Sequence, residues 1–173
     1  VQEFAEIRLA TSIRKIAHDG DRTQVIFDDE SADEFDVVIG ADGLHSNTRN
    51  LSFSEAEVTK RYLGFFSSAY RLPNVLGLNE RFENHMEQTR YMCVYTTRDS
   101  DLACVFIWQS DALAVPPAET RFNELRTQFD GAPEVVQEVL GAFPQGQTVY
   151  MDPLIQIEMD KWSKGNVVLL GDA

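Results

Sequence analysis

Two short turns that contain aspartate and glycine are the parts of this sequence whose residue types best fit binding chemistry. The turn Gly-Ala-Asp-Gly at residues 40–43 follows an apolar run at 37–39, and Gly171 and Asp172 follow an apolar run at 167–170. A carboxylate at the end of a strand can accept hydrogen bonds from ribose hydroxyls, and glycine lets the backbone approach a ligand closely. Taken alone, each motif is more often an ordinary tight turn, because Asp-Gly is a favoured turn pair.

The elements that must position these turns form an α+β pattern. Both apolar runs are typical of strands that are covered on both faces inside a sheet. Elsewhere, alternating and helical periodicity predicts a mostly antiparallel or mixed sheet with helices on one face. We expect strands at 4–16, 23–27, 60–72, 89–97, 102–109 and 148–158, helices at 44–50, 118–129 and 134–142, and loops at 28–34 and 73–87.

Cys93 and Cys104 are the two cysteines of the chain, and both lie in the predicted hairpin at 89–109. A turn centred near Ser100 would place Cys93 opposite Ile107 and Cys104 opposite Thr96. The two thiols would then lie on opposite faces of the hairpin, which disfavours a disulfide. Free thiols are typical of a reducing cytosol, so we expect a cytoplasmic protein.

The residues around the two turns carry a resemblance to a known family. The first motif reads Asp36-Val-Val-Ile-Gly-Ala-Asp-Gly-Leu-His-Ser-Asn-Thr-Arg49, and the second reads Lys164-Gly-Asn-Val-Val-Leu-Leu-Gly-Asp-Ala173. In this order they resemble two signatures of the class A FAD-dependent monooxygenases, the relatives of para-hydroxybenzoate hydroxylase and of the tetracycline-inactivating hydroxylases. The resemblance covers nearly the whole chain, because the hairpins and helices between the motifs suit the substrate domain of that family.

The resemblance implies the cofactor-binding residues. In the family the first signature lies close to the flavin pyrophosphate and to the reduced nicotinamide cofactor. The carboxylate of the second signature holds flavin ribitol or ribose hydroxyls. Cofactor binding is therefore expected of Gly40, Asp42, Gly43, Ser46, Arg49, Gly171 and Asp172.

The family's Gly-x-Gly-x-x-Gly turn, which binds the dinucleotide pyrophosphate, does not occur in this sequence. We therefore expect an internal fragment of a longer enzyme. Residues 1–55 and 161–173 would belong to an FAD-binding α/β domain, and residues 56–160 would form the substrate-binding domain. We also expect that the fragment alone carries no FAD and is inactive.

The resemblance further implies the reaction of the parent enzyme. NAD(P)H reduces the flavin, oxygen adds to form a C4a-hydroperoxide, and this species hydroxylates an aromatic or polycyclic small molecule. The cofactor carries the difficult step, so the protein needs no catalytic side chain of its own. In agreement, the sequence contains neither a nucleophile elbow nor a metal-ligand spacing.

Apolar and aromatic residues occupy both faces of the predicted hairpin at 89–109. A sheet with one face in water would alternate with polar residues, so we expect both faces to be covered. Helices would cover one face, and the flavin domain together with the substrate would cover the other. On this hypothesis the substrate contacts are Phe65, Tyr91, Phe106 and Trp108.

Charge excludes some partners. The 173 residues include 15 Lys and Arg against 28 Asp and Glu, which gives a formal net charge of −13. Such a chain repels nucleic acid and anionic membranes, and it has no apolar run long enough to span a bilayer. The sequence allows an oligomer without specifying one.

Two alternatives remain open at this point. A flavin-dependent halogenase or a reductase of the same architecture would share both motifs. A non-catalytic binding domain would use them as plain turns.

Overall fold

The computed structural model describes residues 5–19 and 21–173. The chain divides into two compact units. The first comprises Val1–Arg61 and Ile155–Ala173, and the second comprises Tyr62–Leu154. The elements in chain order are β1 (Ile13–Asp19), β2 (Arg22–Phe27), β3 (Ala32–Phe35), β4 (Val38–Gly40), α1 (Asn47–Ser52), a 3-10 helix (Glu55–Glu57), β5 (Thr59–Leu72), β6 (Phe82–Met86), β7 (Arg90–Thr96), β8 (Leu102–Gln109), α2 (Arg121–Gln128), α3 (Glu134–Gly141), β9 (Tyr150–Glu158), β10 (Ser163–Lys164) and β11 (Val167–Leu169).

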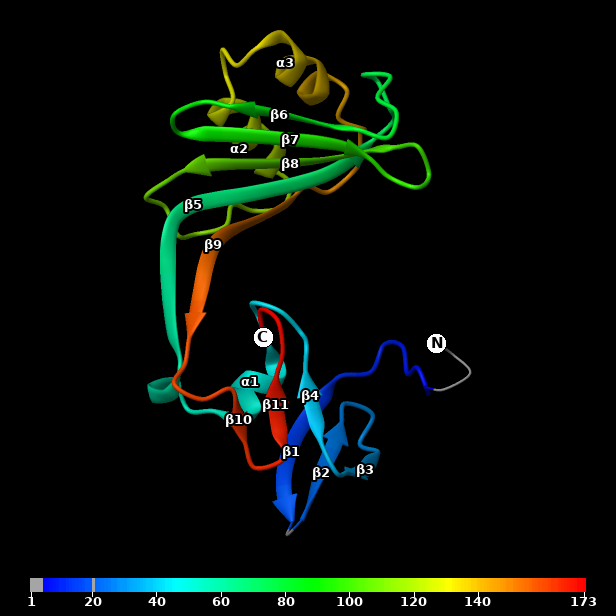
Figure 1. Ribbon diagram of the computed structural model, residues 1–173, viewed down its shortest axis with the longest axis vertical. Coiled ribbons are helices and arrows are strands. Elements are labelled where there is room, and N and C mark those ends of the chain that lie inside the picture. The colour runs from blue at the N-terminus through cyan, green and yellow to red at the C-terminus, as the bar shows by residue number, and fades with distance from the viewer. Residues whose placement is uncertain (1–4, 20) are drawn as a thin grey trace. The chain divides into compact units, whose positions relative to one another are not determined.

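The second unit holds most of a five-stranded sheet with the strand order β6-β7-β8-β5-β9 (Figure 1). Burial alternates strictly along β8. Leu102, Cys104, Phe106 and Trp108 lie in the core, and the residues between them are only half-buried. The apolar residues of α2 and α3, among them Leu125 and Val139, pack in the same core. Helices therefore cover one face of the sheet, which confirms the predicted α+β class.

Arg90 joins β7 to the end of α2. Its Nη1 donates hydrogen bonds to the carbonyl oxygens of Gln128 at 3.0 Å and Asp130 at 2.9 Å. Its guanidinium also lies 5.8 Å from the ring centroid of Phe129. A cation at a helix C-terminus satisfies carbonyl groups that the helix leaves unpaired, so Arg90 stabilises the contact between sheet and helix.

The register of the β7–β8 hairpin differs from the prediction by two residues. Cys93 lies opposite Val105, and Cys104 lies opposite Val94. The turn is closed by a hydrogen bond from the Thr97 N–H to the Asp101 carbonyl at 2.8 Å. A shift of two residues keeps every side chain on its predicted face, so the thiols still lie on opposite faces and both are free.

The first unit contains two three-stranded sheets, with the orders β1-β2-β3 and β10-β11-β4. The predicted hairpin at its start is confirmed, since β1 and β2 pair antiparallel. The expected strand at 4–16 is wrong in its bounds, because β1 begins at Ile13 and continues to Asp19, whereas residues 5–12 form no strand. The side chains of Val25, Val38 and Val167 are buried together between these sheets. Phe53, which ends α1, packs with Leu169 in a second small cluster.

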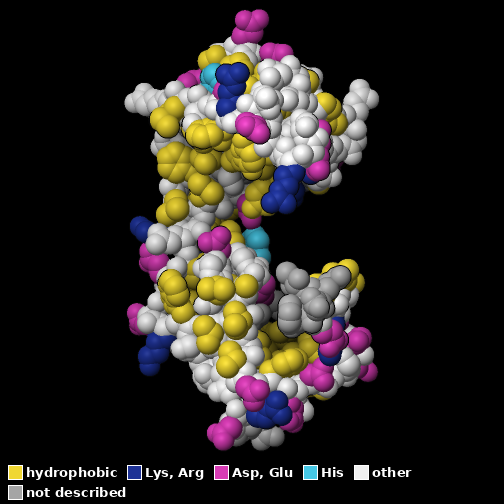
Figure 2. Space-filling model, turned by 45° about the vertical axis from the view of Figure 1, so that its right-hand side comes forward, with side chains coloured by type: hydrophobic (Ala, Val, Ile, Leu, Met, Phe, Trp, Pro, Cys, Tyr) yellow, Lys and Arg dark blue, Asp and Glu magenta, His cyan; other side chains and the backbone are white. Residues whose placement is uncertain are grey.

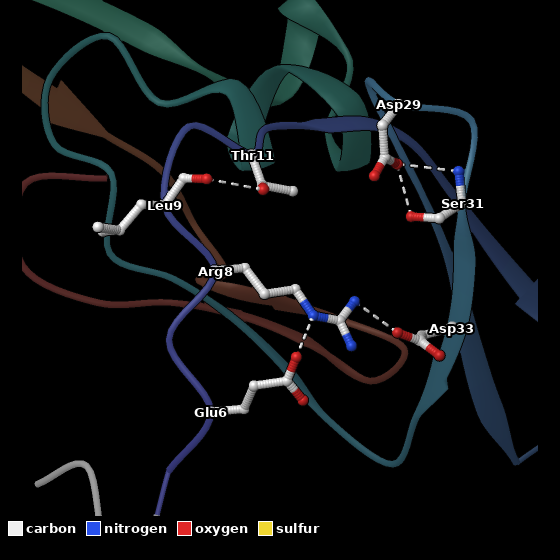
Figure 3. Close-up of polar contacts among 7 residues, drawn as sticks. All are labelled: Glu6, Arg8, Leu9, Thr11, Asp29, Ser31 and Asp33. Carbon is white, nitrogen blue, oxygen red and sulfur yellow. Dashed lines mark hydrogen bonds and ion pairs between the residues drawn. The ribbon is translucent and has the colours of Figure 1, made fainter.

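Two strands form where the sequence predicted loops. The acidic segment of β3 pairs with β2, and β6 pairs with β7 along an edge of the larger sheet. The pairing of β3 is supported by Arg8, which donates to Asp33 at 2.6 Å and to Glu6 at 2.7 Å (Figure 3). Contacts with neighbouring strands therefore outweigh the weak intrinsic strand preference of these polar segments.

Candidate functional site at the carboxyl edge of β4 and β11

Strands β4 and β11 are parallel neighbours although a long stretch of sequence separates them. Val167 lies opposite Val38, and Leu169 lies opposite Gly40. The Leu170 N–H donates to the Gly40 carbonyl at 2.8 Å, at the last step of the pair. Both aspartate turns therefore begin at the same edge of one sheet, the edge at which α/β folds bind nucleotides.

The first turn is organised around the carboxylate of Asp42. Its Oδ1 accepts a hydrogen bond from the Ser46 hydroxyl. Its Oδ2 accepts from the Thr48 backbone N–H at 2.9 Å and from the Thr48 hydroxyl at 3.0 Å. Gly43 takes a positive φ of 74°, and its carbonyl accepts from the Ser46 N–H at 2.9 Å. The aspartate thus fixes the path of the chain from β4 into α1.

These contacts set the protonation of Asp42. Burial raises the pKa of this carboxyl, but hydrogen bonds from Ser46 and Thr48 favour the charged form and outweigh burial. The net result is a pKa below its ordinary value. Asp42 is therefore ionised at neutral pH.

Arg49 lies completely buried beneath this turn, with a relative exposure of 0%. Its Nη2 donates to the Leu44 carbonyl at 2.6 Å, whereas its Nε and Nη1 have no hydrogen-bond partner among the described residues. Burial lowers the pKa of Arg49, and the charge of Asp42 partly restores it. A buried cation with unused donors is costly, which makes it a candidate for holding an anion.

Gly40 is needed for packing. A Cβ atom at this position would lie 2.8 Å from the Cβ and Cγ2 atoms of Thr48 and 3.0 Å from Cδ2 of Leu169. Helix α1 can therefore lie against the end of β4 only if residue 40 has no side chain. Thr48, which the sequence did not single out, thus contacts both Gly40 and Asp42.

The second turn leaves its carboxylate free. Gly171 has a φ of 69° with open space around it, and Asp172 is exposed. Within the described part of the chain, the Asp172 side chain has neither a hydrogen bond nor an ion pair. Its oxygens are therefore available to accept hydrogen bonds from a ligand.

The expected cover of both strands is only half present. Val38 and Leu169 are buried, but Ile39 and Leu170 are each 61% exposed, and Val37 is 54% exposed. The apolar run at 37–39 and its partner at 167–170 therefore bury one face within this chain and leave the other open.

The predicted substrate contacts separate onto two faces of the larger sheet. Phe65 is 37% exposed and Tyr91 is half-buried, both on the face without helices. The Tyr91 hydroxyl donates to Oδ1 of Asn84 on β6 at 2.6 Å. On the same face lies a hollow of about 500 Å³, lined by Glu80, Arg81, Phe82, Cys93, Tyr95 and Thr96.

Phe106 and Trp108, which were expected at the substrate, lie instead in the core on the helix-covered face. Phe106 has no exposed surface, and Trp108 is 3% exposed. Their ring centroids lie 5.1 Å and 6.3 Å from that of Phe129 in edge-to-face contacts. Both residues therefore stabilise the second unit, because their positions in β8 point them toward α2.

Other reactive groups give no further site. Burial raises the pKa of the Cys104 thiol to about 12, so it is protonated at neutral pH. The described residues contain no cluster of His, Cys, Asp and Glu that could hold a metal ion. Among those residues there is also no helix with the length and apolar composition needed to cross a membrane.

Comparison with known proteins gives relatives over most of the chain. The chain matches no protein-family model. It is 34% identical over 175 residues to an uncharacterized protein of Mycobacterium tuberculosis, covering 99% of this chain and 47% of that protein. It is 32% identical to a flavin-dependent monooxygenase of an unknown prokaryotic organism, covering 94% of this chain and 42% of that protein. The chain thus spans about half the length of the curated relatives it matches.

Solved structures agree with these relatives. The tetracycline destructase Tet(55) superposes with a TM-score of 0.79 at 25% identity, over 93% of this chain and 44% of that chain. Tet(51) gives a TM-score of 0.76 at 26% identity, over 94% and 45%. The resemblance to class A FAD-dependent monooxygenases is therefore confirmed over the matched section, together with the fold.

Proposed function

We propose that this chain is a section of an FAD- and NAD(P)H-dependent monooxygenase that hydroxylates an aromatic or polycyclic small molecule. The observation that carries the proposal is the parallel pairing of β4 with β11, which brings the turns of Asp42 and Asp172 to one sheet edge. The similarity to proteins named flavin-dependent monooxygenase supports the same conclusion.

The residues at this edge fit a dinucleotide. Asp172 has free carboxylate oxygens that would accept hydrogen bonds from ribose or ribitol hydroxyls. The glycines Gly43 and Gly171 would let a ligand approach the backbone, since a Cβ at either would meet no atom within 4 Å. The positive charge of Arg49 beneath the turn favours a bound phosphate group.

Some residues of the site would shape the turn and would not contact the cofactor. Ser46 and Gly40 would contribute by shaping the turn, because Ser46 bonds Asp42 and Gly40 packs against Thr48. When bound, FAD supplies the redox chemistry with NAD(P)H and oxygen. The residues of this chain would bind and orient the cofactor and exclude water from it.

The open face of the larger sheet would receive part of the substrate. Phe65 and Tyr91 present aromatic surface that would pack against a planar ring system. The Tyr91–Asn84 pair adds a polar group to this apolar surface, which would orient a hydroxyl or carbonyl substituent. Two free cysteines, Cys93 and Cys104, are compatible with the cytoplasmic location we propose.

Asp172→Asn in the parent-length protein tests the proposal. The variant keeps the size of the side chain but loses the charge, so charge-assisted hydrogen bonds worth about 1.5–3 kcal/mol would be weakened. We expect the Kd for FAD, measured by flavin fluorescence, to rise roughly 10- to 100-fold. Asp160→Asn, at another exposed carboxylate of the same unit, is the matched control and should leave the Kd unchanged.

Two results would contradict the proposal. One is a purified parent protein that binds no flavin and does not consume NAD(P)H and oxygen with any aromatic compound. The other is an equal effect of the Asp160 and Asp172 variants on the Kd for FAD. Chloride-dependent halogenation without hydroxylation would favour a halogenase of the same architecture.

A further inference from the structure

Strand β6 forms one edge of the five-stranded sheet (Figure 1). It pairs only with β7, so its outer side has no strand partner in the part of the chain that the structure describes. The Glu87 N–H donates to the Arg90 carbonyl at 2.8 Å, where the β6–β7 hairpin closes. Hydrogen-bonded and non-bonded positions alternate along an antiparallel pair, so the backbone groups of Phe82, Asn84 and Met86 point away from β7. These three residues therefore present donors and acceptors along a free edge.

The side chains beside this edge do not protect it. Phe82 is 64% exposed and Met86 is 79% exposed. Figure 2 shows hydrophobic side chains at several places on the surface, so exposure alone does not identify a contact. Free edges are usually blunted by lysine, proline or a bulge, and β6 has none of these. A strand edge of this kind is suited to pairing with another strand.

The sequence of β6 is complementary to itself when it is read antiparallel. Aligning the whole five-residue strand with a second copy of itself places a two-fold axis at Asn84. Phe82 of each copy then lies opposite Met86 of the other, which joins the two exposed apolar side chains. The same register places Glu83 opposite His85, a carboxylate opposite an imidazole that can donate to it. Apolar pairs and donor–acceptor pairs of this kind stabilise neighbouring strands.

Charge is complementary at both ends of the same register. Arg81 is exposed and has neither a hydrogen bond nor an ion pair to any described residue. The two-fold axis would bring it opposite Glu87 of the second copy. Oε2 of Glu87 accepts from Arg90 Nε at 2.8 Å, which leaves Oε1 able to accept from Arg81. Each end of the contact would therefore gain an ion pair, although the copies each carry a net charge of −13.

We propose that β6 pairs antiparallel with β6 of a second copy of this chain, so that one sheet continues across a two-fold dimer. Such a contact uses the same surface of both copies, so it closes at the dimer and does not extend further. Met86 of the second copy would lie beside Phe82, which lines the hollow of about 500 Å³ on the open face. The contact would thus enlarge the apolar surface around that hollow.

The size of the contact sets the expected affinity. Each copy contributes one strand of five residues, which is less than a standard protein interface supplies. We therefore expect a Kd on the order of 10–100 μM. The inference goes beyond the proposed function and does not depend on flavin binding.

Sedimentation velocity of the parent-length protein, at concentrations that span this Kd, tests the register. Phe82→Lys and Met86→Glu, made singly, each place a charge opposite an apolar side chain and should raise the dimer Kd at least about tenfold. The double variant places the introduced lysine opposite the introduced glutamate on both sides of the axis. It should restore the Kd to within about threefold of the original value. The two positions are roughly 13 Å apart within one strand, so the recovery reports contact between copies.

Controls separate the loss of the contact from other effects of added charge. Leu113→Lys adds the same charge at a residue of the same unit that is 59% exposed, and it should leave the Kd unchanged. Because Phe82 and Met86 are largely exposed, neither substitution should lower the thermal midpoint of the monomer. Arg81→Glu, outside the strand, places two carboxylates together at each end of the contact and should also raise the Kd.

Three results would overturn the proposal. A parent-length protein that stays monomeric at every concentration would show that the β6 edge is covered by another segment or stays unpaired. A dimer whose Kd the single variants leave unchanged would use a different surface. Loss of the dimer in both single variants, without recovery in the double variant, would exclude this register.

Discussion

Gly40→Ala is the most direct test of how the aspartate turn is built. The added Cβ would lie 2.8 Å from two carbon atoms of Thr48 and 3.0 Å from one carbon of Leu169. Carbon atoms prefer a separation of about 3.5–4.0 Å, so α1 must move away from β4 by several tenths of an ångström. Overpacking of this kind costs about 1–3 kcal/mol. The movement would also lengthen both hydrogen bonds from Thr48 to Asp42.

Urea unfolding measures the total cost, and hydrogen exchange shows which unit carries it. We expect faster exchange at residues 38–53 and unchanged exchange in β7 and β8, because those strands belong to the second unit. Gly141→Ala at the end of α3 is the matched control. No atom lies within 4 Å of its added Cβ, so alanine should stabilise the helix by up to about 1 kcal/mol. If Gly40→Ala leaves the free energy of unfolding unchanged or raises it as Gly141→Ala does, Thr48 can move aside and packing does not require Gly40.

Two further predictions concern charge and core packing. Asp42→Asn should make the free energy of unfolding depend less on pH in the acidic range. In the wild-type protein, hydrogen bonds hold the folded pKa of Asp42 below its unfolded value. The stabilisation by Asp42 is therefore present above about pH 4 and is lost as the pH falls through the folded pKa. Urea titrations at several acidic pH values check this, and parallel curves for both proteins would contradict it. Phe106→Ala should cost about 3–5 kcal/mol, because the ring is fully buried against Tyr70 and Phe129. Phe65→Ala on the open face should cost less than half as much, and equal thermal shifts would refute the assignment of faces.

Local patterns in the sequence predicted several elements. The β7–β8 hairpin was predicted from two apolar runs joined by a polar turn, and the helices α2 and α3 from apolar residues at helical spacing. In contrast, β3 and β6 were missed. Polar and apolar residues alternate too weakly in these segments to predict a strand. The segments become strands because each pairs with the edge of a neighbouring strand.

The candidate site was predictable in part. The residue types at the two turns indicated that each follows the end of a strand. Periodicity does not reveal that β4 pairs with β11, because the two strands are distant in sequence and their pairing depends on the tertiary fold. The burial of Arg49 and the double role of Thr48 were not predictable, because both depend on how α1 lies against the sheet. Phe106 was wrongly predicted to contact the substrate, because the sequence does not show which face of the sheet the helices cover.

The carboxylates of Asp42 and Asp172 differ in how many hydrogen-bond acceptor positions remain unused. A carboxylate has about four acceptor positions, and Asp42 uses three of them within its own turn. It also bonds the groups that hold α1 in place, so its loss would move the backbone that a ligand approaches. Asp172 uses none within the described chain, and its neighbour Gly171 leaves the surrounding space open. It follows that Asp42 acts mainly by positioning the turn, whereas Asp172 would act by direct contact, although the two residues follow equivalent strands.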